Sequence, residues 1–232
     1  MATSFSQLPQ QTGAPLVKWS ACPHPQKTIS QGQYCRLEPI TATQHGAYLW
    51  QAFSADTEHR IWTYLPYGPF DNQSQLEDWI NATCLGDDPL FYAIVDQHSG
   101  KALGVASYLR IQPEVGVIEV GHINFSPVLQ QTTAATEAMY LMMKNIFDLG
   151  YRRYEWKCDN LNLGSKAAAK RLGFSYDGLF KQATIYKGRN RDTAWFSILD
   201  SDWPSLKVAY EQWLAASNFA SGGRQIDALQ AH

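Results

Sequence analysis

The short segment between residues 130 and 136 has the composition of a loop that lets a ligand approach the backbone. It reads QQTTAAT, with only glutamine, threonine and alanine, and it joins a predicted strand at 115–125 to a predicted helix. Such a turn leaves several backbone N–H groups unpaired at the positive end of the helix dipole, which suits phosphate. Bulky side chains would block that approach. An ordinary polar helix start is the alternative explanation.

A second feature is the pair of charges Glu155 and Lys157 on a strand predicted at 151–159, where they alternate with aromatic and apolar residues. The pattern predicts a central strand. Charges on a central strand are costly unless they line a cleft or are paired. Two roles for Glu155 follow: acid–base chemistry on the substrate side, or pairing with neighbouring cations.

Periodicity and turn residues predict the elements that position these groups. A buried helical face with three-and-four spacing runs from Ala135 to Leu149 and ends at Gly150. Because this helix links the strands at 115–125 and 151–159, those two strands should run parallel. Further strands are predicted at 34–40, on both sides of a turn in 91–111, and in 174–199; further helices are predicted at 43–53, 72–84, 162–173 and 203–216.

These elements predict one mixed α/β domain whose sheet carries helices on both faces. A length of 232 residues suits a single domain with extensions. Residues 1–31, rich in Pro, Gln and Ser, are predicted to form an extended arm, residues 32–217 the domain, and residues 218–232 a flexible tail.

Composition excludes several classes of function. A net charge of -2 offers no electrostatic attraction for nucleic acid or an anionic membrane. The four scattered cysteines form no C-x-x-C pair, so neither a disulfide framework nor a metal site is expected. The first residues do not resemble a secretory signal, and no apolar run approaches the ~20 residues of a membrane span. The Walker and dinucleotide glycine motifs are missing from the sequence. We therefore expect a cytoplasmic protein that is neither a nucleoside triphosphatase nor a dinucleotide enzyme.

The segment Gln130-x-x-Thr133-x-Ala135, followed by Thr136-Glu137-Ala138, resembles the pyrophosphate motif Q/R-x-x-G-x-G/A of the GNAT acetyltransferases. Within that superfamily the chain is similar to the branch of the ribosomal-protein N-terminal acetyltransferases RimJ and RimL. Three more segments agree in order: IEVGH at 118–122, N-x-x-S with RLGF at 162–174, and the hairpin at 186–199. The resemblance covers roughly residues 34–204.

One position departs from the family pattern. Thr133 stands where the family usually has glycine. A residue other than glycine can donate the same N–H group unless its φ must be positive. We therefore expect cofactor binding to survive this change.

The resemblance implies a GNAT fold: a mixed, mostly antiparallel sheet with helices on both faces and a parallel strand pair that splays at the cofactor site. It implies acetyl transfer from acetyl-CoA to an amine by direct attack, without a metal. The N–H groups of the 130–135 loop would hold the pyrophosphate, and the end of the preceding strand would face the pantetheine arm. The implied cofactor-binding residues are Phe125, Ser126, Gln130, Gln131, Thr132, Thr133, Ala134, Ala135, Asn162 and Ser165.

Two residues are candidates for the chemical step. Glu119 is the leading general base, because an acid beside apolar neighbours can have its pKa raised toward neutrality. Strand alternation places Glu119 opposite Ile118 and Val120, and places His122 on the other face from Glu119. A carboxylate paired with a cation is the alternative for Glu119. The resemblance nominates Ser165 to protonate or hydrogen-bond the CoA sulfur, a role compatible with capping its helix.

The sequence thus predicts an N-acetyltransferase whose acceptor is a primary amine of a small molecule or a protein N-terminus. Two alternatives stay open: a non-catalytic acyl-CoA-binding sensor or interaction module, and a transferase using another acyl or aminoacyl donor. No nucleic-acid or membrane partner is expected, and a homodimer is compatible with the sequence.

Overall fold

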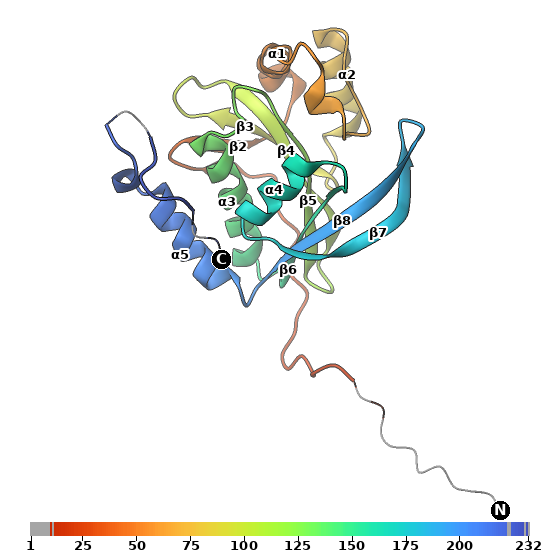
Figure 1. Ribbon diagram of the computed structural model, residues 1–232, viewed down its shortest axis with the longest axis vertical. Helices are drawn as coiled ribbons and strands as arrows, with labels where there is room; N and C mark the ends of the chain where they lie inside the picture. Colours follow the sequence, from red (N-terminus) through yellow and green to blue (C-terminus); the bar gives the residue numbers. More distant parts are fainter. Residues whose placement is uncertain (1–9, 11, 222–223, 230, 232) are drawn as a thin grey trace, which may run out of the picture.

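A single eight-stranded sheet organises the computed structural model, which describes residues 10, 12–221, 224–229 and 231 (Figure 1). The strand order is β1-β2-β3-β4-β5-β6-β8-β7. The strands are β1 (Ser30–Gln31), β2 (Cys35–Pro39), β3 (Leu90–Asp96), β4 (Ala102–Gln112), β5 (Val117–Phe125), β6 (Arg153–Asp159), β7 (Ser175–Tyr186) and β8 (Arg189–Leu199). The helices are α1 (Ala42–Phe53), α2 (Gln73–Thr83), α3 (Thr133–Asp148), α4 (Leu163–Arg171) and α5 (Trp203–Leu214), with short 3₁₀ turns η1 (Arg60–Trp62) and η2 (Ala216–Asn218).

The pair β5–β6 is parallel, and the other neighbouring strands in the order are antiparallel. This confirms the predicted crossover through α3. The parallel pairing runs only from Val117 opposite Arg153 to Val120 opposite Trp156, although β5 continues to Phe125 and β6 to Asp159. The two strands therefore separate beyond Val120, which is the splay expected of the GNAT fold.

Helices cover both faces of the sheet, as predicted (Figure 1). On one face α3, α4 and α5 bury a large apolar cluster that includes Ile118, Val120, Tyr154 and Trp156. On the other face α1 and α2 cover only the β2–β4 half, around Phe91. The β5–β8 half of this second face, which we call the charged face, carries the side chains that alternate with the buried apolar ones.

Side-chain caps explain where the main helices begin. Thr41, Asn72, Thr132 and Asn162 each cap a helix by accepting a hydrogen bond from a backbone N–H three residues further on. Gly150, with φ at 89°, follows Leu149, the residue that caps the C-terminal end of α3. A left-handed residue there suits glycine, because glycine has no Cβ to clash.

Glu137 of α3 fastens the start of β2 to the core. Its buried carboxylate accepts hydrogen bonds from the backbone N–H groups of Gln33, Tyr34 and Cys35, at 2.7, 2.6 and 2.7 Å. The glutamate of the family-like Thr-Glu-Ala segment is therefore structural, because all three bonds tie two elements about a hundred residues apart in the chain.

The segments on both sides of the domain make contacts with it. In the arm, Trp19 Nε1 donates to the Glu114 carbonyl and Cys22 lies in the main core. Beyond α5, the buried Asn218 organises the following residues, and Leu229 packs against the core. Within the described residues no helix is long and apolar enough to cross a membrane. The four cysteines are free.

Candidate active site

The turn between β5 and α3 accommodates Thr133 at the position where the family usually has glycine. Thr133 is the first residue of α3 and does not have a positive φ, so the missing glycine strains nothing there. The left-handed residue is Gln131, with φ at 62°. Thr132 caps the helix, its Oγ1 accepting from the Ala135 N–H at 3.1 Å.

Half of the six N–H groups predicted to face a phosphate already have acceptors inside the turn. Gln130 N–H donates to the Ser126 carbonyl, Thr132 N–H to the Leu129 carbonyl, and Ala135 N–H to the cap. Across the described part of the chain, no acceptor is found for the N–H groups of Gln131, Thr133 and Ala134. These three remain at the positive end of a 16-residue helix, as an anion site requires.

Phe125, Ser126 and the Gln130 side chain hold the turn in place. Gln130 Nε2 donates to the Phe125 carbonyl at 2.9 Å, and the Ser126 N–H donates to the Leu103 carbonyl at 3.1 Å. These backbone groups therefore shape the turn, and are not free for a ligand.

A bulge in β5 lies where the strands separate. The β4 pairing shifts by one residue between Val105 opposite Asn124 and Ser107 opposite Gly121, and His122 has φ at 50°. Asn124 is buried, yet neither its Oδ1 nor its Nδ2 has a partner among the residues described. A buried amide without partners is costly, so it marks a polar site at the bulge. The sequence analysis missed Asn124; its only signal was a lone amide in an apolar strand.

The bulge also reverses the predicted direction of His122. Its ring stacks on Tyr67 at 5.6 Å and on Phe91 at 4.9 Å, on the side of α1 and α2. Simple alternation placed it on the opposite face from Glu119, which is wrong because the extra residue changes the phase. Burial, aided by the nearby Arg110 charge, lowers the pKa of His122 to about 4.

Ser165 lies at the start of α4, beside Trp156, the last residue of β6 that pairs with β5. Its Oγ accepts a hydrogen bond from Trp156 Nε1 at 2.9 Å, and the same hydroxyl interacts with the thiol of Cys158. The capping role predicted for Ser165 is wrong: Asn162 caps α4, and its Oδ1 accepts from the Ser165 N–H at 3.0 Å.

Glu119 is buried on the charged face, 3% exposed, and is held by two cations. Arg110 Nε lies 2.6 Å and Lys157 Nζ 3.0 Å from its Oε2. Lys157 is itself buried and lies 3.6 Å from the Trp195 ring centroid. Proton transfer to Glu119 therefore requires a water or a rearrangement of these ion pairs.

Glu155 continues the same network. Lys157 Nζ lies 2.8 Å from its Oε2, and Arg153 Nε 2.8 Å from its Oε1. Arg153 also reaches Asp177 at 2.6 Å. Burial alone would raise the pKa of Glu155, but the hydrogen bonds and charges of Arg153 and Lys157 outweigh it and lower the pKa below its usual value. The pairing with neighbouring cations, one of the two roles considered, is present.

The predicted base and acid lie on opposite faces of the same strand pair. Glu119 belongs to the charged face, whereas Ser165 bonds to Trp156, whose ring packs in the α3 core. A reacting group in the gap beyond Val120 would have one residue on each side. Linear alternation along β5 could not relate these two residues, because Ser165 is positioned by α4 and Trp156.

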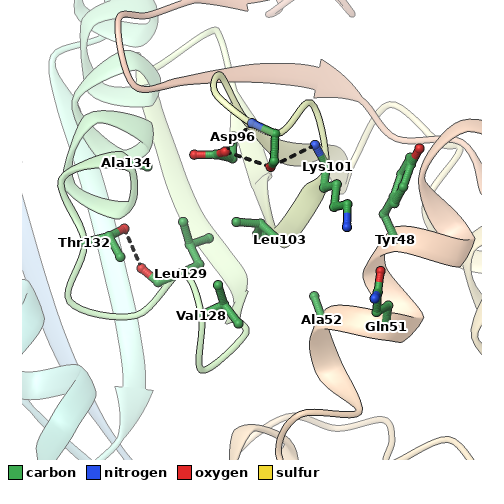
Figure 2. A pocket seen from close by; sticks show the side chains of 11 residues that line it. Tyr48, Gln51, Ala52, Asp96, Lys101, Leu103, Val128, Leu129, Thr132 and Ala134 are labelled. Carbon is green, nitrogen blue, oxygen red and sulfur yellow. Dashed lines mark hydrogen bonds between the residues drawn. The ribbon is translucent and has the colours of Figure 1, made fainter.

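A pocket of about 520 Å³ lies beside the turn, between α1, the β3–β4 hairpin and the β5–α3 turn (Figure 2). Its floor is largely apolar, with Leu103, Val128 and Leu129, and Lys101 extends along it. A second pocket, of about 340 Å³, lies on the turn itself and includes Arg171.

Comparison with known proteins identifies the class. The family model described as the acetyltransferase (GNAT) domain matches residues 35–175, which is more than half of the chain. The chain belongs to the GNAT acetyltransferase family.

Solved structures agree with this assignment. A GCN5-related N-acetyltransferase from Brucella melitensis is 47% identical over 93% of this chain and 98% of its own, with a TM-score of 0.90. A GNAT-family acetyltransferase from Chromobacterium violaceum is 40% identical over 85% of this chain and 100% of its own, with a TM-score of 0.78. The microcin C7 self-immunity acetyltransferase MccE, in complex with acetyl-CoA and AMP, shares the fold at 21% identity over 72% of this chain and 93% of its own, with a TM-score of 0.63. No match was found among curated proteins.

Proposed function

We propose that this protein is a cytoplasmic N-acetyltransferase that transfers the acetyl group of acetyl-CoA to a primary amine. The observation that carries the proposal is the separation of β5 from β6 beyond Val120, directly before a turn with three unpaired N–H groups. The side of β5 that faces β6 has no strand partner there, so its backbone can bond the amides of a pantetheine arm. The unpaired N–H groups of Gln131, Thr133 and Ala134 suit the pyrophosphate.

The remaining donor-site residues have supporting roles in this proposal. Thr132, Gln130, Phe125 and Ser126 keep the turn in its open shape, and Ala135 leaves room at the first turn of α3. Asn162 uses its Oδ1 for capping, which leaves its amide N–H groups for the pantetheine.

The chemical step is attack of the neutral amine nitrogen on the thioester carbonyl carbon, followed by breakage of the carbon–sulfur bond. The proton lost by the amine passes through water to Glu119. Ser165 donates a hydrogen bond to the departing thiolate, while Trp156 fixes the orientation of its hydroxyl. A donor placed where negative charge develops stabilises the transition state more than the ground state.

The acceptor is the amine of a small molecule or a protein N-terminus, and the motifs that resemble the RimJ and RimL branch support either choice. No metal takes part.

Calorimetric titration with acetyl-CoA tests the donor, with ATP as a control. Micromolar binding that ATP does not reproduce supports the proposal, whereas no binding to the intact chain overturns it. Release of free thiol on addition of panels of amines then identifies the acceptor.

The variant Glu119→Gln separates enzyme from sensor. We expect turnover to fall by about 10²-fold or more with acetyl-CoA binding unchanged. Binding without turnover for any amine, and identical behaviour of the variant, would favour the acyl-CoA-binding sensor instead.

A further inference from the structure

The second pocket joins the turn of α3 to a part of the chain far from it in sequence. Its volume is about 340 Å³, and it shares only Thr132 with the lining of the larger pocket in Figure 2. Its lining residues come from the turn, α4, α5 and the segment beyond α5: Gln131, Thr132, Thr133, Arg171, Trp213, Phe219 and Gln225.

Two side chains of this pocket have unused hydrogen-bonding capacity. Trp213 is 4% exposed, and its indole N–H has no acceptor in the described part of the protein. Arg171 donates to Thr136 Oγ1 at 3.2 Å and lies 5.5 Å from the Trp213 ring centroid, and no described carboxylate forms an ion pair with it. Arg171 and Trp213 line the same pocket as Gln131 and Thr133, whose backbone N–H groups are unpaired, and such a set of donors suits an anion.

The residues after α5 are held against this pocket by Asn218, which is buried. Its Nδ2 donates to the Trp213 carbonyl at 2.9 Å, and its Oδ1 accepts from the Asp227 N–H at 2.8 Å. A bridge pairs Phe219 with Gln225, and the Phe219 ring lies 5.8 Å from that of Trp213. We call residues 218–221 and 224–229 the C-terminal segment.

We propose that the C-terminal segment forms a wall of the donor site and binds the nucleotide end of the acyl-CoA. Trp213 and Arg171 receive a phosphate, while Phe219 and Gln225 face the adenosine. This inference rests on the proposed function, because it assumes that the phosphates bind at the turn of α3. An aromatic ring and an amide suit a purine, which offers a flat face and a polar edge.

Three variants test the proposal in the full chain. Trp213→Phe keeps an aromatic ring and removes the N–H; Gln225→Ala removes the amide; Gln212→Ala is the matched control, since Gln212 is an exposed glutamine beside Trp213 that does not line the pocket. Calorimetry is run with acetyl-CoA, with adenosine 3′,5′-bisphosphate as the nucleotide end alone, and with S-acetylpantetheine as the other end.

We expect Trp213→Phe to weaken the binding of acetyl-CoA and of the bisphosphate by about tenfold, because a hydrogen bond to a charged group is lost. Gln225→Ala should weaken the binding of both ligands about threefold, because a neutral hydrogen bond is lost. Gln212→Ala should change neither, and S-acetylpantetheine should bind all variants equally.

Gln225→Ala decides the matter if the core substitution at Trp213 lowers the folded fraction, because Gln225 is exposed. If acetyl-CoA binds the intact chain, Gln225→Ala and a folded Trp213→Phe with equal affinity, this inference is overturned. The proposed function would remain. No binding of acetyl-CoA to the intact chain would instead remove the proposed function.

Discussion

Glu119 and Glu155 face each other across the parallel pair β5–β6 and share one ammonium group. They are register partners, and Lys157 Nζ lies 3.0 Å from one carboxylate and 2.8 Å from the other. Two buried carboxylates at this spacing repel each other unless a cation lies between them. The arrangement explains why the central strand carries a lysine between a tryptophan and a cysteine.

Replacing Lys157 with methionine should therefore destabilise the fold strongly. Removing one member of a buried ion pair costs about 3–5 kcal/mol. Here the two buried carboxylates lose the cation between them, while Arg110 and Arg153 each still hold one of them. Lys144→Met is the control, since Lys144 forms an exposed pair with Asp148 that is worth less than about 1 kcal/mol. Urea unfolding measures the free energy of unfolding of both variants. Equal losses would show that the ion pairs of Lys157 stabilise the fold no more than a surface pair does.

Ser165→Ala should lower kcat by about 10²-fold and leave KM for acetyl-CoA nearly unchanged. The hydroxyl is expected to act only when the sulfur becomes negative, so its loss should affect the transition state alone. Trp156→Phe, which removes the N–H that orients the hydroxyl, should cause a smaller loss of the same kind. Steady-state kinetics measures this; an increase in KM with unchanged kcat would assign Ser165 to ground-state binding.

Gln131 offers a matched pair of substitutions at the turn. Its φ of 62° is open to glycine and strongly disfavours β-branched residues. Gln131→Gly should keep acetyl-CoA affinity within about threefold, whereas Gln131→Val should weaken it about tenfold or more by displacing the turn. Calorimetric titration compares the two. If valine were tolerated as well as glycine, the left-handed conformation would not matter for binding.

His122 should make the protein less stable in mild acid. Its pKa is about 4 in the folded protein and about 6.5 when exposed, so between these values the unfolded chain binds the extra proton. Stability therefore rises with pH in this window, and lowering the pH from about 7 to about 5 should cost at most about 2 kcal/mol through this residue.

The variant His122→Gln isolates the contribution of the imidazole. Urea unfolding at the two pH values should show a smaller difference for this variant than for the native chain. An unchanged difference would mean that other groups account for the acid sensitivity.

Much of the fold could be predicted from the sequence because its signals are local. The α3 stripe, the Asn162 cap and Gly150 act within a few residues, so they identify helices and their ends without knowledge of the rest. The crossover through α3 dictates a parallel pair, and the small side chains at 130–136 indicate an approachable turn. The family was indicated by the resemblance of the motifs at 118–122, 130–138 and 162–174, and the family model confirms it.

Tertiary structure decided what depends on neighbours from distant parts of the chain. Three features depend on contacts between distant parts of the chain: the insertion of β8 between β6 and β7, the ion pairs of Glu119 with Arg110 and Lys157, and the pocket that Trp213 and Gln225 both line. One extra residue in β5 turned His122 to the other face. Local sequence patterns cannot predict such contacts. Their energy depends on strand register, side-chain burial and neighbouring charges, which are fixed only once the sheet is assembled.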